Sequence, residues 1–343
     1  MERKYISRNS LTDCLKKIQT EGGSIYAPVS RSGQTDFHVI KSVDEITTGH
    51  IQTTRSAKAV VFPCTEKLFS YKKEKNDVKL QDYNPDELLS EILVFGTHPC
   101  DAVGFGPLGG IFNWDTEDKP YNEHRRRITL ITLACTRCDE YCFCTSVNSG
   151  PGNTEGSDIL LTPVKDDGYL AEIVTDKGSE WYKKYGSFFE EAPENLHKED
   201  YLVEIPVKFN LEEVCTKVTD MFESDLWRLQ SERCIGCGAC AYVCPTCACF
   251  DIQEYARGTS GSRIRCWDSC GFALFTLHTS GHNPRPNQSQ RWRQRLMHKF
   301  SYMPDRLSVV GCTGCGRCSR ACPVDMNLSE HLQMWQEYDN VKM

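Results

Sequence analysis

Apolar residues near the start of the chain recur at helical spacing. Leu11, Leu15 and Ile18 follow one another at intervals of three or four residues, which places their side chains on one face of an α-helix. Asn9 and Ser10 lie just before them, and either side chain could cap the first turn. The pattern therefore predicts an amphipathic helix near the start of the chain.

Short apolar runs farther along predict buried strands. Each run is rich in β-branched residues and ends near Pro, Gly or Cys; the three runs lie at 59–63, 91–96 and 128–134. Two alternating runs in 160–175 flank an Asp-Asp-Gly turn and predict a hairpin. The polar, glycine-rich segment 146–158 predicts a long loop. Residues 1–205 are thus predicted to form a mixed α/β domain.

The second half of the chain has a different pattern. Apolar residues at helical spacing predict one helix that leads into a dense cysteine motif and another near the C-terminus. The residues that carry these two patterns are Leu211, Val214, Val218, Met221, Phe222 and Leu226, and then Leu328, Leu332, Met334 and Trp335. A length of 343 residues exceeds the usual size of a single-core domain. We therefore expect a second, mainly helical domain over 206–343.

Charge and hydropathy exclude several classes of protein. Hydrophobic residues make up 39% of the chain and charged residues 25%, and no apolar run is long enough for a membrane span. The first residues lack the apolar core of a signal peptide. The net charge of −7 argues against a nucleic-acid partner. We therefore expect a cytoplasmic protein without a membrane span.

Cysteine is unusually abundant, with 20 residues in the chain. In a reducing compartment, clustered cysteines indicate metal or redox centres before they indicate disulfides. The pattern C-x2-C-x2-C-x3-C-P occurs twice, as Cys234, Cys237, Cys240, Cys244 and Pro245, and as Cys312, Cys315, Cys318, Cys322 and Pro323. Thiolates at this spacing hold a 4Fe-4S cubane, and the interleaved glycines let backbone amides approach the sulfides. Structural zinc, the alternative, generally uses paired C-x2-C units instead.

The two motifs predict a pair of neighbouring clusters. In two-cluster proteins the fourth cysteine of each run ligates the other cluster. The predicted ligand sets are Cys234, Cys237, Cys240 and Cys322 for the first cubane, and Cys312, Cys315, Cys318 and Cys244 for the second. The 67 residues from 245 to 311 far exceed the connection in a small bacterial ferredoxin. A helical two-cluster ferredoxin, acting as an electron relay, is therefore expected.

Nearly the whole chain resembles a known family of iron-sulfur subunits. Besides the two motifs, the resemblance is carried by VFPCTEKLF (61–69), GTHPCDA (96–102), the arginine-rich stretch 121–127, CFCTSVNSGPG (142–152), WDSC (267–270) and HKF (298–300). These segments resemble the subunit called beta in cytoplasmic sulfhydrogenases and A in anaerobic sulfite reductases. Subunits of this family are also found beside flavoprotein and heterodisulfide-reductase-like subunits.

The resemblance implies an electron-transfer subunit of a soluble oxidoreductase complex, without catalytic activity of its own. Its implied partners are a flavoprotein subunit that binds FAD and NAD(P) and a terminal oxidoreductase subunit of hydrogenase, sulfite reductase or heterodisulfide-reductase type. The expected fold class is α+β, with the mixed α/β domain followed by the helical ferredoxin domain. Two other classes stay open: a self-contained iron-sulfur enzyme with its substrate site in the first domain, and a nucleic-acid repair protein with structural clusters.

A further group of cysteines follows two of the predicted strands. Its members are Cys100, Cys135, Cys138, Cys142 and Cys144. We expect a third 4Fe-4S cluster here, held either by the last four or by Cys100 with Cys135, Cys142 and Cys144, because Cys138 departs from the pattern of the family. A zinc site and unligated thiols are the alternatives. His98 and Asp101 are expected to orient this loop.

The remaining cysteines and basic residues have two interpretations each. Cys247, Cys249, Cys266 and Cys270 are interpreted as packing residues, with a dithiol or an extra ligand set as the alternative. The segment 285–299 carries five basic residues and no acidic one; it is either a solvated helix face or a source of cations that raise cluster potentials or steer a partner. No phosphate-binding or nickel motif is present, so flavin and nucleotide are assigned to partner chains.

Overall fold

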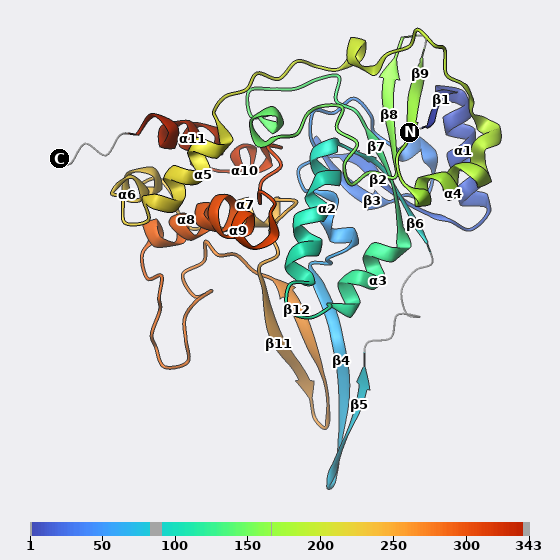
Figure 1. The fold of residues 1–343 in the computed structure, drawn as a ribbon. Coiled ribbons are helices and arrows are strands. Elements are labelled where there is room, and N and C mark those ends of the chain that lie inside the picture. Colours follow the sequence, from blue (N-terminus) through green and yellow to red (C-terminus); the bar gives the residue numbers. More distant parts are fainter. Residues whose placement is uncertain (1, 83–90, 166, 339–343) are drawn as a thin grey trace.

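The computed structural model describes residues 2–82, 91–165 and 167–338 (Figure 1). Two sheets, the helices that flank the larger one and a separate group of helices make up this part of the chain. The predicted α+β class is confirmed. No helix in the described residues is long and apolar enough to cross a membrane.

The larger sheet has parallel strands at its centre. Its strands are β1 (Glu2–Ser7), β2 (Ser24–Arg31), β3 (Gln34–Val39), β6 (Ile92–Thr97), β7 (Ile128–Leu133), β8 (Ile159–Val164), β9 (Gly168–Ile173) and β10 (Glu190–Glu191). They pair in the order β10-β1-β9-β8-β7-β6-β2-β3. Strands β2, β6, β7 and β8 run parallel to one another, and every other neighbouring pair in the sheet is antiparallel, so that β3, β9 and β10 run opposite to the central strands and β1 runs in their direction. The carboxyl ends of β6 and β7 therefore meet at one edge.

Helices cover both faces of this sheet (Figure 1). Helices α1 (Arg8–Thr20) and α4 (Asp176–Tyr185) lie on one face, and α2 (Pro99–Phe112) and α3 (Lys119–Arg127) on the other. Along β6, Leu93 and Phe95 join the core with α1, whereas Val94 joins the core with α2. This alternation follows from the two-residue period of a strand.

Most of the predicted elements in this half are confirmed. The helix, the strands near 91–96 and 128–134, and the hairpin β8–β9 are present, although residue 166 of its turn lies outside the described residues. The predicted cap at Asn9 or Ser10 is wrong, because β1 runs directly into α1 and the Ser7 side chain accepts a hydrogen bond from the Ser10 amide.

The predicted strand at 59–63 is also wrong. Its residues form the short 3-10 helix η2 (Ala57–Val60) and the turn after it, which pack against α2. A short apolar run is compatible with either a buried strand or a buried turn, because length and periodicity do not distinguish them. The other 3-10 helices are η1 (Val43–Glu45), η4 (Cys144–Val147), η5 (Gly186–Phe188) and η6 (Lys198–Tyr201).

The second half is mainly helical, as predicted. Its helices are α5 (Leu211–Asp220), α6 (Leu226–Ser231), α7 (Ala239–Tyr242), α8 (Gln288–Met297), the π-helical turn η7 (His298–Tyr302), α9 (Met303–Leu307), α10 (Arg317–Arg320) and α11 (Leu328–Glu337). The helix expected over 211–226 is divided into α5 and α6, and the Trp227 indole donates to the Met221 carbonyl across the break (3.1 Å). Leu296, Phe300, Leu332 and Trp335 form the centre of the core.

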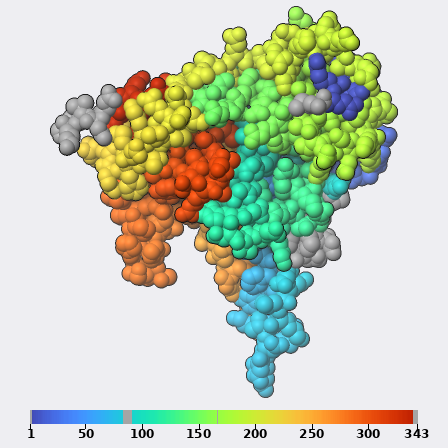
Figure 2. All heavy atoms as spheres, viewed as in Figure 1, coloured from blue at the N-terminus to red at the C-terminus, as the bar shows by residue number. Residues whose placement is uncertain are grey.

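A second, four-stranded sheet joins segments from both halves. Its strands β4 (Thr65–Glu74), β5 (Asp77–Asp82), β11 (Phe250–Arg257) and β12 (Ser260–Trp267) pair in the order β11-β12-β4-β5. Figure 2 shows the β4–β5 end of this sheet projecting from the body of the molecule. The hairpin β11–β12 was not predicted from the sequence. Because β12 pairs with β4, the two halves share this sheet.

Arg265, on β12, links the base of this sheet to the larger domain through buried ion pairs. Only 1% of the residue is exposed, and its guanidinium donates to the carboxylates of Glu66 and Asp118. It also stacks within 5.5 Å of the ring centres of Phe62, Phe112 and Phe250. Burial raises the pKa of Glu66, but the hydrogen bond with His124 and the charge of Arg265 bring it below its usual value. Arg265 thus neutralises buried carboxylate charge.

We expect Arg265→Met to lower the free energy of unfolding by about 3 to 5 kcal/mol, because it leaves a buried carboxylate without its cation. Arg263→Gln in the same strand is the control, since the Arg263–Glu254 ion pair is 43% and 40% exposed and such pairs contribute less than about 1 kcal/mol. Denaturant unfolding under anaerobic conditions measures both. Equal losses in the two variants would contradict this role of Arg265.

Candidate metal centres

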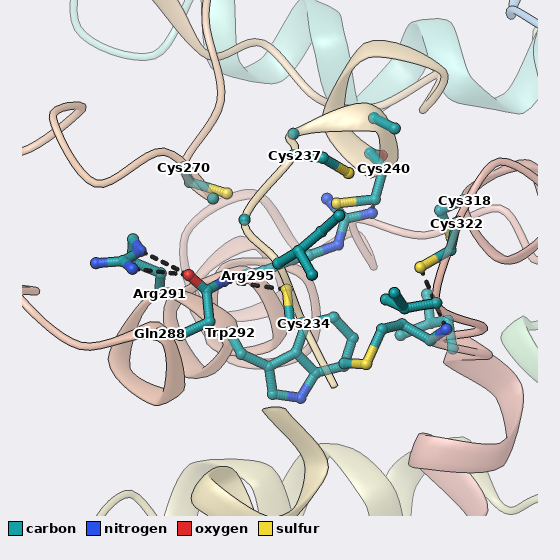
Figure 3. Close-up of a pocket in the computed structure, with 18 residues that line it drawn as sticks. Cys234, Cys237, Cys240, Cys270, Gln288, Arg291, Trp292, Arg295, Cys318 and Cys322 are labelled. Carbon is teal, nitrogen blue, oxygen red and sulfur yellow. Dashed lines mark hydrogen bonds between the residues drawn. The ribbon is translucent and has the colours of Figure 1, made fainter. Parts of the chain in front are cut away.

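The first cysteine motif forms a loop that opens onto a cavity. Gly236 and Gly238 have φ angles of 68° and 77°, a left-handed conformation that glycine adopts without strain. The cavity beside this loop is lined by Cys234, Cys237, Cys240 and Cys322, as well as by Cys270 and Cys318 (Figure 3). Three of the first four belong to the first motif, and Cys322 belongs to the second.

The second motif lines a neighbouring cavity. Its cysteines are Cys312, Cys315 and Cys318 from the second motif and Cys244 from the first. Cys318 lines both cavities, so the two share a wall. Each cavity thus contains the four cysteines that crossed ligation of two cubanes requires.

Three buried cations surround these cysteines. Lys58, Arg295 and Lys299 are 3%, 4% and 3% exposed, respectively. Among the described residues, none of the three forms an ion pair with a carboxylate, and the negatively charged neighbours that act on their pKa values most strongly are cysteine sulfurs. An unpaired buried charge is costly. The arrangement therefore fits anionic, cluster-bound thiolates.

The contacts of Lys299 and Arg295 point to individual sulfurs. The Lys299 ammonium lies 3.4 Å from Cys244 Sγ and donates to Thr246 Oγ1 and the Gly311 carbonyl at 2.9 and 2.6 Å. Arg295 donates to Cys247 Sγ at 3.5 Å and to the Cys240 carbonyl at 3.0 Å. Both cations come from the basic segment, which is therefore not a fully solvated helix face.

Burial and charge act in opposite directions on this group. Burial alone would lower the pKa of Lys299, but the sulfurs of Cys244 and Cys247 raise it above its usual value. Burial also raises the pKa of Cys312 to about 12 and that of Cys318 to about 11. A thiolate at these positions needs a bound metal and a nearby cation.

The N-terminal cysteines gather at the carboxyl ends of β6 and β7. Cys100 lies in the first turn of α2, directly after β6, and Cys135 follows β7. Burial raises the pKa of Cys135, and the nearby charges of Cys144, Cys142, Asp101 and Cys138 raise it further. Burial and the charge of Asp101 likewise raise the pKa of Cys100, with smaller contributions from Cys315 and Cys135. The Cys138 thiol instead donates to the Glu204 carbonyl at 3.8 Å. Cys100, Cys135, Cys142 and Cys144 thus lie in one region, and the Cys138 thiol is engaged by the Glu204 carbonyl.

Two arginines of α10 hold this group against the second motif. Arg317 forms an ion pair with Asp101 (2.7 Å) and hydrogen-bonds Thr53 and Gln52, and Gln52 in turn donates to Cys100 Sγ at 3.2 Å. Arg320 donates to Cys142 Sγ at 3.3 Å. Asp101 thus positions the loop through Arg317.

The backbones of the two regions are also in contact. The Phe143 amide donates to the Gly314 carbonyl at 2.9 Å. A Cβ atom on Gly314 would lie 2.5 Å from the Cys144 backbone, and one on Gly316 would lie 2.4 Å from the Tyr141 carbonyl oxygen. Only glycine allows this approach. The N-terminal cysteines are therefore immediate neighbours of the second cavity.

Polar atoms in this region lack protein partners. Asp101 Oδ1, Arg317 Nη1 and His50 Nδ1 are buried and have no hydrogen-bond partner among the described residues. Buried polar atoms without partners in the protein call for an explanation, such as strain, an ordered water or an ion. No three His, Cys, Asp or Glu residues of the described chain are placed to hold a single metal ion.

His98 lies beside this group but is not placed as a ligand. Its ring stacks on that of His50 with 5.0 Å between ring centres, and its backbone amide donates to Asp101 Oδ2 at 3.4 Å. Burial lowers the pKa of His98 to about 3, so the ring is neutral. His98 therefore belongs to the packing that orients the loop.

We expect Lys299→Met to lower the reduction potential of the cluster bound in the second cavity by on the order of tens of millivolts, because the substitution removes one buried positive charge close to the cluster. The positive charge stabilises the reduced, more negative state. Lys299→Arg, which keeps the charge, should stay near the wild-type potential. An anaerobic redox titration followed by electron paramagnetic resonance measures both variants, with iron content as the check on loading. An unchanged potential in Lys299→Met would contradict the charge argument.

Comparisons with known proteins agree with this geometry. The 4Fe-4S dicluster domain family matches residues 233–326, which span both motifs. The sulfhydrogenase 2 subunit beta of Pyrococcus furiosus is 29% identical over 324 residues, covering 92% of each chain. No solved structure matches the chain. The chain is thus similar over most of its length to this sulfhydrogenase beta subunit, and its residues 233–326 match the 4Fe-4S dicluster domain.

Proposed function

We propose that this chain relays electrons between a flavoprotein subunit, which binds FAD and NAD(P), and a terminal oxidoreductase subunit of hydrogenase, sulfite reductase or heterodisulfide-reductase type. The observation that carries the proposal is the pair of adjoining cavities, each lined by the crossed set of four cysteines. The related P. furiosus protein is named as one subunit of a sulfhydrogenase, which supports assembly with other oxidoreductase subunits.

The chain's own residues would hold two clusters and set their potentials. Cys234, Cys237, Cys240 and Cys322 are the proposed ligands of the first, and Cys312, Cys315, Cys318 and Cys244 those of the second. Bound clusters of this kind accept and release single electrons. Lys299 and Arg295 stabilise the negative charge at the sulfurs.

A third cluster at Cys100, Cys135, Cys142 and Cys144 would extend the relay. This group adjoins the second cavity through Gly314 and Arg320, and the second cavity adjoins the first through Cys318. The first cavity lies nearest the surface, because Cys237 is exposed and 65% of Ile235 is exposed. The proposed path therefore runs from the N-terminal group through the second cavity to the surface at Ile235.

A self-contained enzyme is the less favoured alternative. Its substrate site was expected at an open cluster, on the loop 142–158, but this loop is packed against the rest of the domain. A Cβ on Gly156 would lie 2.2 Å from the Ala102 carbonyl oxygen, and Ser157 and Asp158 are buried. Asp158 is used structurally, because it accepts hydrogen bonds from the Leu130 amide and Thr175.

The relay function predicts that the chain alone does not oxidise NADH or NADPH. Electrons should enter only when a flavoprotein partner is present, because nucleotide binding is assigned to that partner. The test is anaerobic mixing of the purified chain with either nucleotide, with and without a co-purified flavoprotein subunit, while cluster absorbance is followed. If the nucleotide bleaches the cluster absorbance with no other protein present, the assignment of nucleotide binding to the flavoprotein partner is wrong.

The third cluster predicts about twelve irons per fully loaded chain instead of about eight, at four irons per cubane. Cys135→Ser and Cys142→Ser should each lower the iron and acid-labile sulfide content by about four atoms. Cys138→Ser should keep the full content, because the Cys138 thiol points to the Glu204 carbonyl. About eight irons in the wild type, or a loss in Cys138→Ser equal to that in Cys135→Ser, would contradict the proposed ligand set.

A further inference from the structure

We propose that the edge of strand β11 joins two copies of this chain, so that the four-stranded sheets of the two molecules form one continuous sheet. The two β11 strands run antiparallel, and the contact has two-fold symmetry. It uses none of the cysteines of the candidate metal centres, and it does not depend on the proposed relay function.

Strand β11 has an edge without a partner strand. Within the described residues it pairs with β12 on one side and with no strand on the other, and it borders the projecting sheet (Figure 1). All eight of its residues are exposed. The strand contains no proline and no lysine, and its pairing with β12 has no bulge. It therefore lacks three of the features by which edge strands commonly prevent pairing with another chain.

Large apolar side chains on this strand are exposed as well. Tyr255 is 69% exposed and Ile252 is 39% exposed. Because successive side chains of a strand alternate between the two faces, these two lie on opposite faces of the sheet. A strand added at this edge would therefore cover apolar surface on both faces while it pairs with the free backbone amides and carbonyls.

The charges of β11 indicate that the added strand is a second copy. Glu254 already has an ion pair, with Arg263 at 2.9 Å. Asp251 accepts a hydrogen bond from the Gln253 side chain at 3.1 Å, but neither Asp251 nor Arg257 has an ion pair within the described part of the chain. These two residues carry opposite charges near opposite ends of β11 and lie on the same face of the sheet. An antiparallel copy brings Asp251 of each strand to Arg257 of the other.

One register of the two strands avoids placing like charges opposite each other. In this register Tyr255 lies opposite its own copy at the two-fold axis, and Gln253 lies opposite Arg257. Arg257 is then the diagonal neighbour of Asp251 in the second copy, within reach of a long side chain. An aromatic pair and opposite charges across two strands both stabilise a sheet. Because the contact joins identical surfaces, it closes after two copies and covers both β11 edges at once.

Anaerobic sedimentation velocity of the purified full chain tests the proposal. One pair of strands is smaller than a standard protein interface, so we expect the wild type to shift from monomer to dimer as its concentration increases. Asp251→Arg and Arg257→Asp should each raise the dimer dissociation constant by about tenfold or more, because each replaces two opposite-charge pairs by two like-charge pairs. A wild-type chain that stays monomeric at every concentration would overturn the proposal.

An equal mixture of these two variants tests the pairing itself. In a mixed dimer, the new positive charge at position 251 of one chain meets the new negative charge at position 257 of the other, and the unchanged Asp251 and Arg257 form the second pair. We therefore expect the mixture to dimerise as the wild type does, although each variant alone dimerises weakly. Recovery in the mixture also shows that both variants are folded. A mixture that dimerises no better than either variant alone contradicts the proposed contact.

Leu80→Lys is the control at the other border of the same sheet. Leu80 lies on β5 and is 65% exposed. This variant should keep the dissociation constant of the wild type, because β5 takes no part in the proposed contact. If Leu80→Lys weakens the dimer as much as Arg257→Asp does, the two copies meet through β5 and the assignment to β11 is wrong.

Discussion

The balance between buried sulfur and buried positive charge is the interaction on which the rest of this structure depends. Lys58, Arg295, Lys299 and Arg317 are each less than one-tenth exposed. In water each would be fully hydrated, and placing them in the interior requires negative charge at short range. For Lys58, Arg295 and Lys299 the nearby negative charge is mainly that of cysteine sulfurs. For Arg317 it is mainly that of Asp101, beside Cys100. Folding and cluster binding are therefore coupled, because either one without the other leaves charge unbalanced.

These cations also explain how the two halves of the chain are joined. Lys58 reaches from the first half to the carbonyls of the first motif, and Arg317 and Arg320 reach from the second motif back to Asp101 and Asp139. The boundary placed at residue 205 from composition remains a prediction. Contacts across it are numerous, and they concentrate where the cysteines are.

The sequence predicts the structure best where the signal is a short motif or the spacing of apolar residues within one element. The spacing of the two cysteine runs predicts two crossed sets of four ligands. Each cavity is lined by one of these sets, the first also by Cys270 and Cys318, and the ligand sets themselves stay a prediction. The strands β6 and β7 follow from their apolar runs. The burial of Arg295 and Lys299 could not be derived, because a basic helix face looks the same in a sequence whether it meets water or sulfur. The hairpin β11–β12 was missed because its residues are largely exposed and lack the alternation of a half-buried strand.

The pairing of β12 with β4 has a consequence for how the chain folds during synthesis. Ser262 lies opposite Ser70, so the strand that completes the small sheet is made long after its partner has left the ribosome. Until then β4 has one unpaired edge, and the carboxylates of Glu66 and Asp118 lack their ion pairs with the guanidinium of Arg265. Contacts of such long sequence separation form late and slowly. The first half of the protein therefore reaches its final form only after most of the second half has been translated, and premature termination would leave an open strand edge that other chains can join.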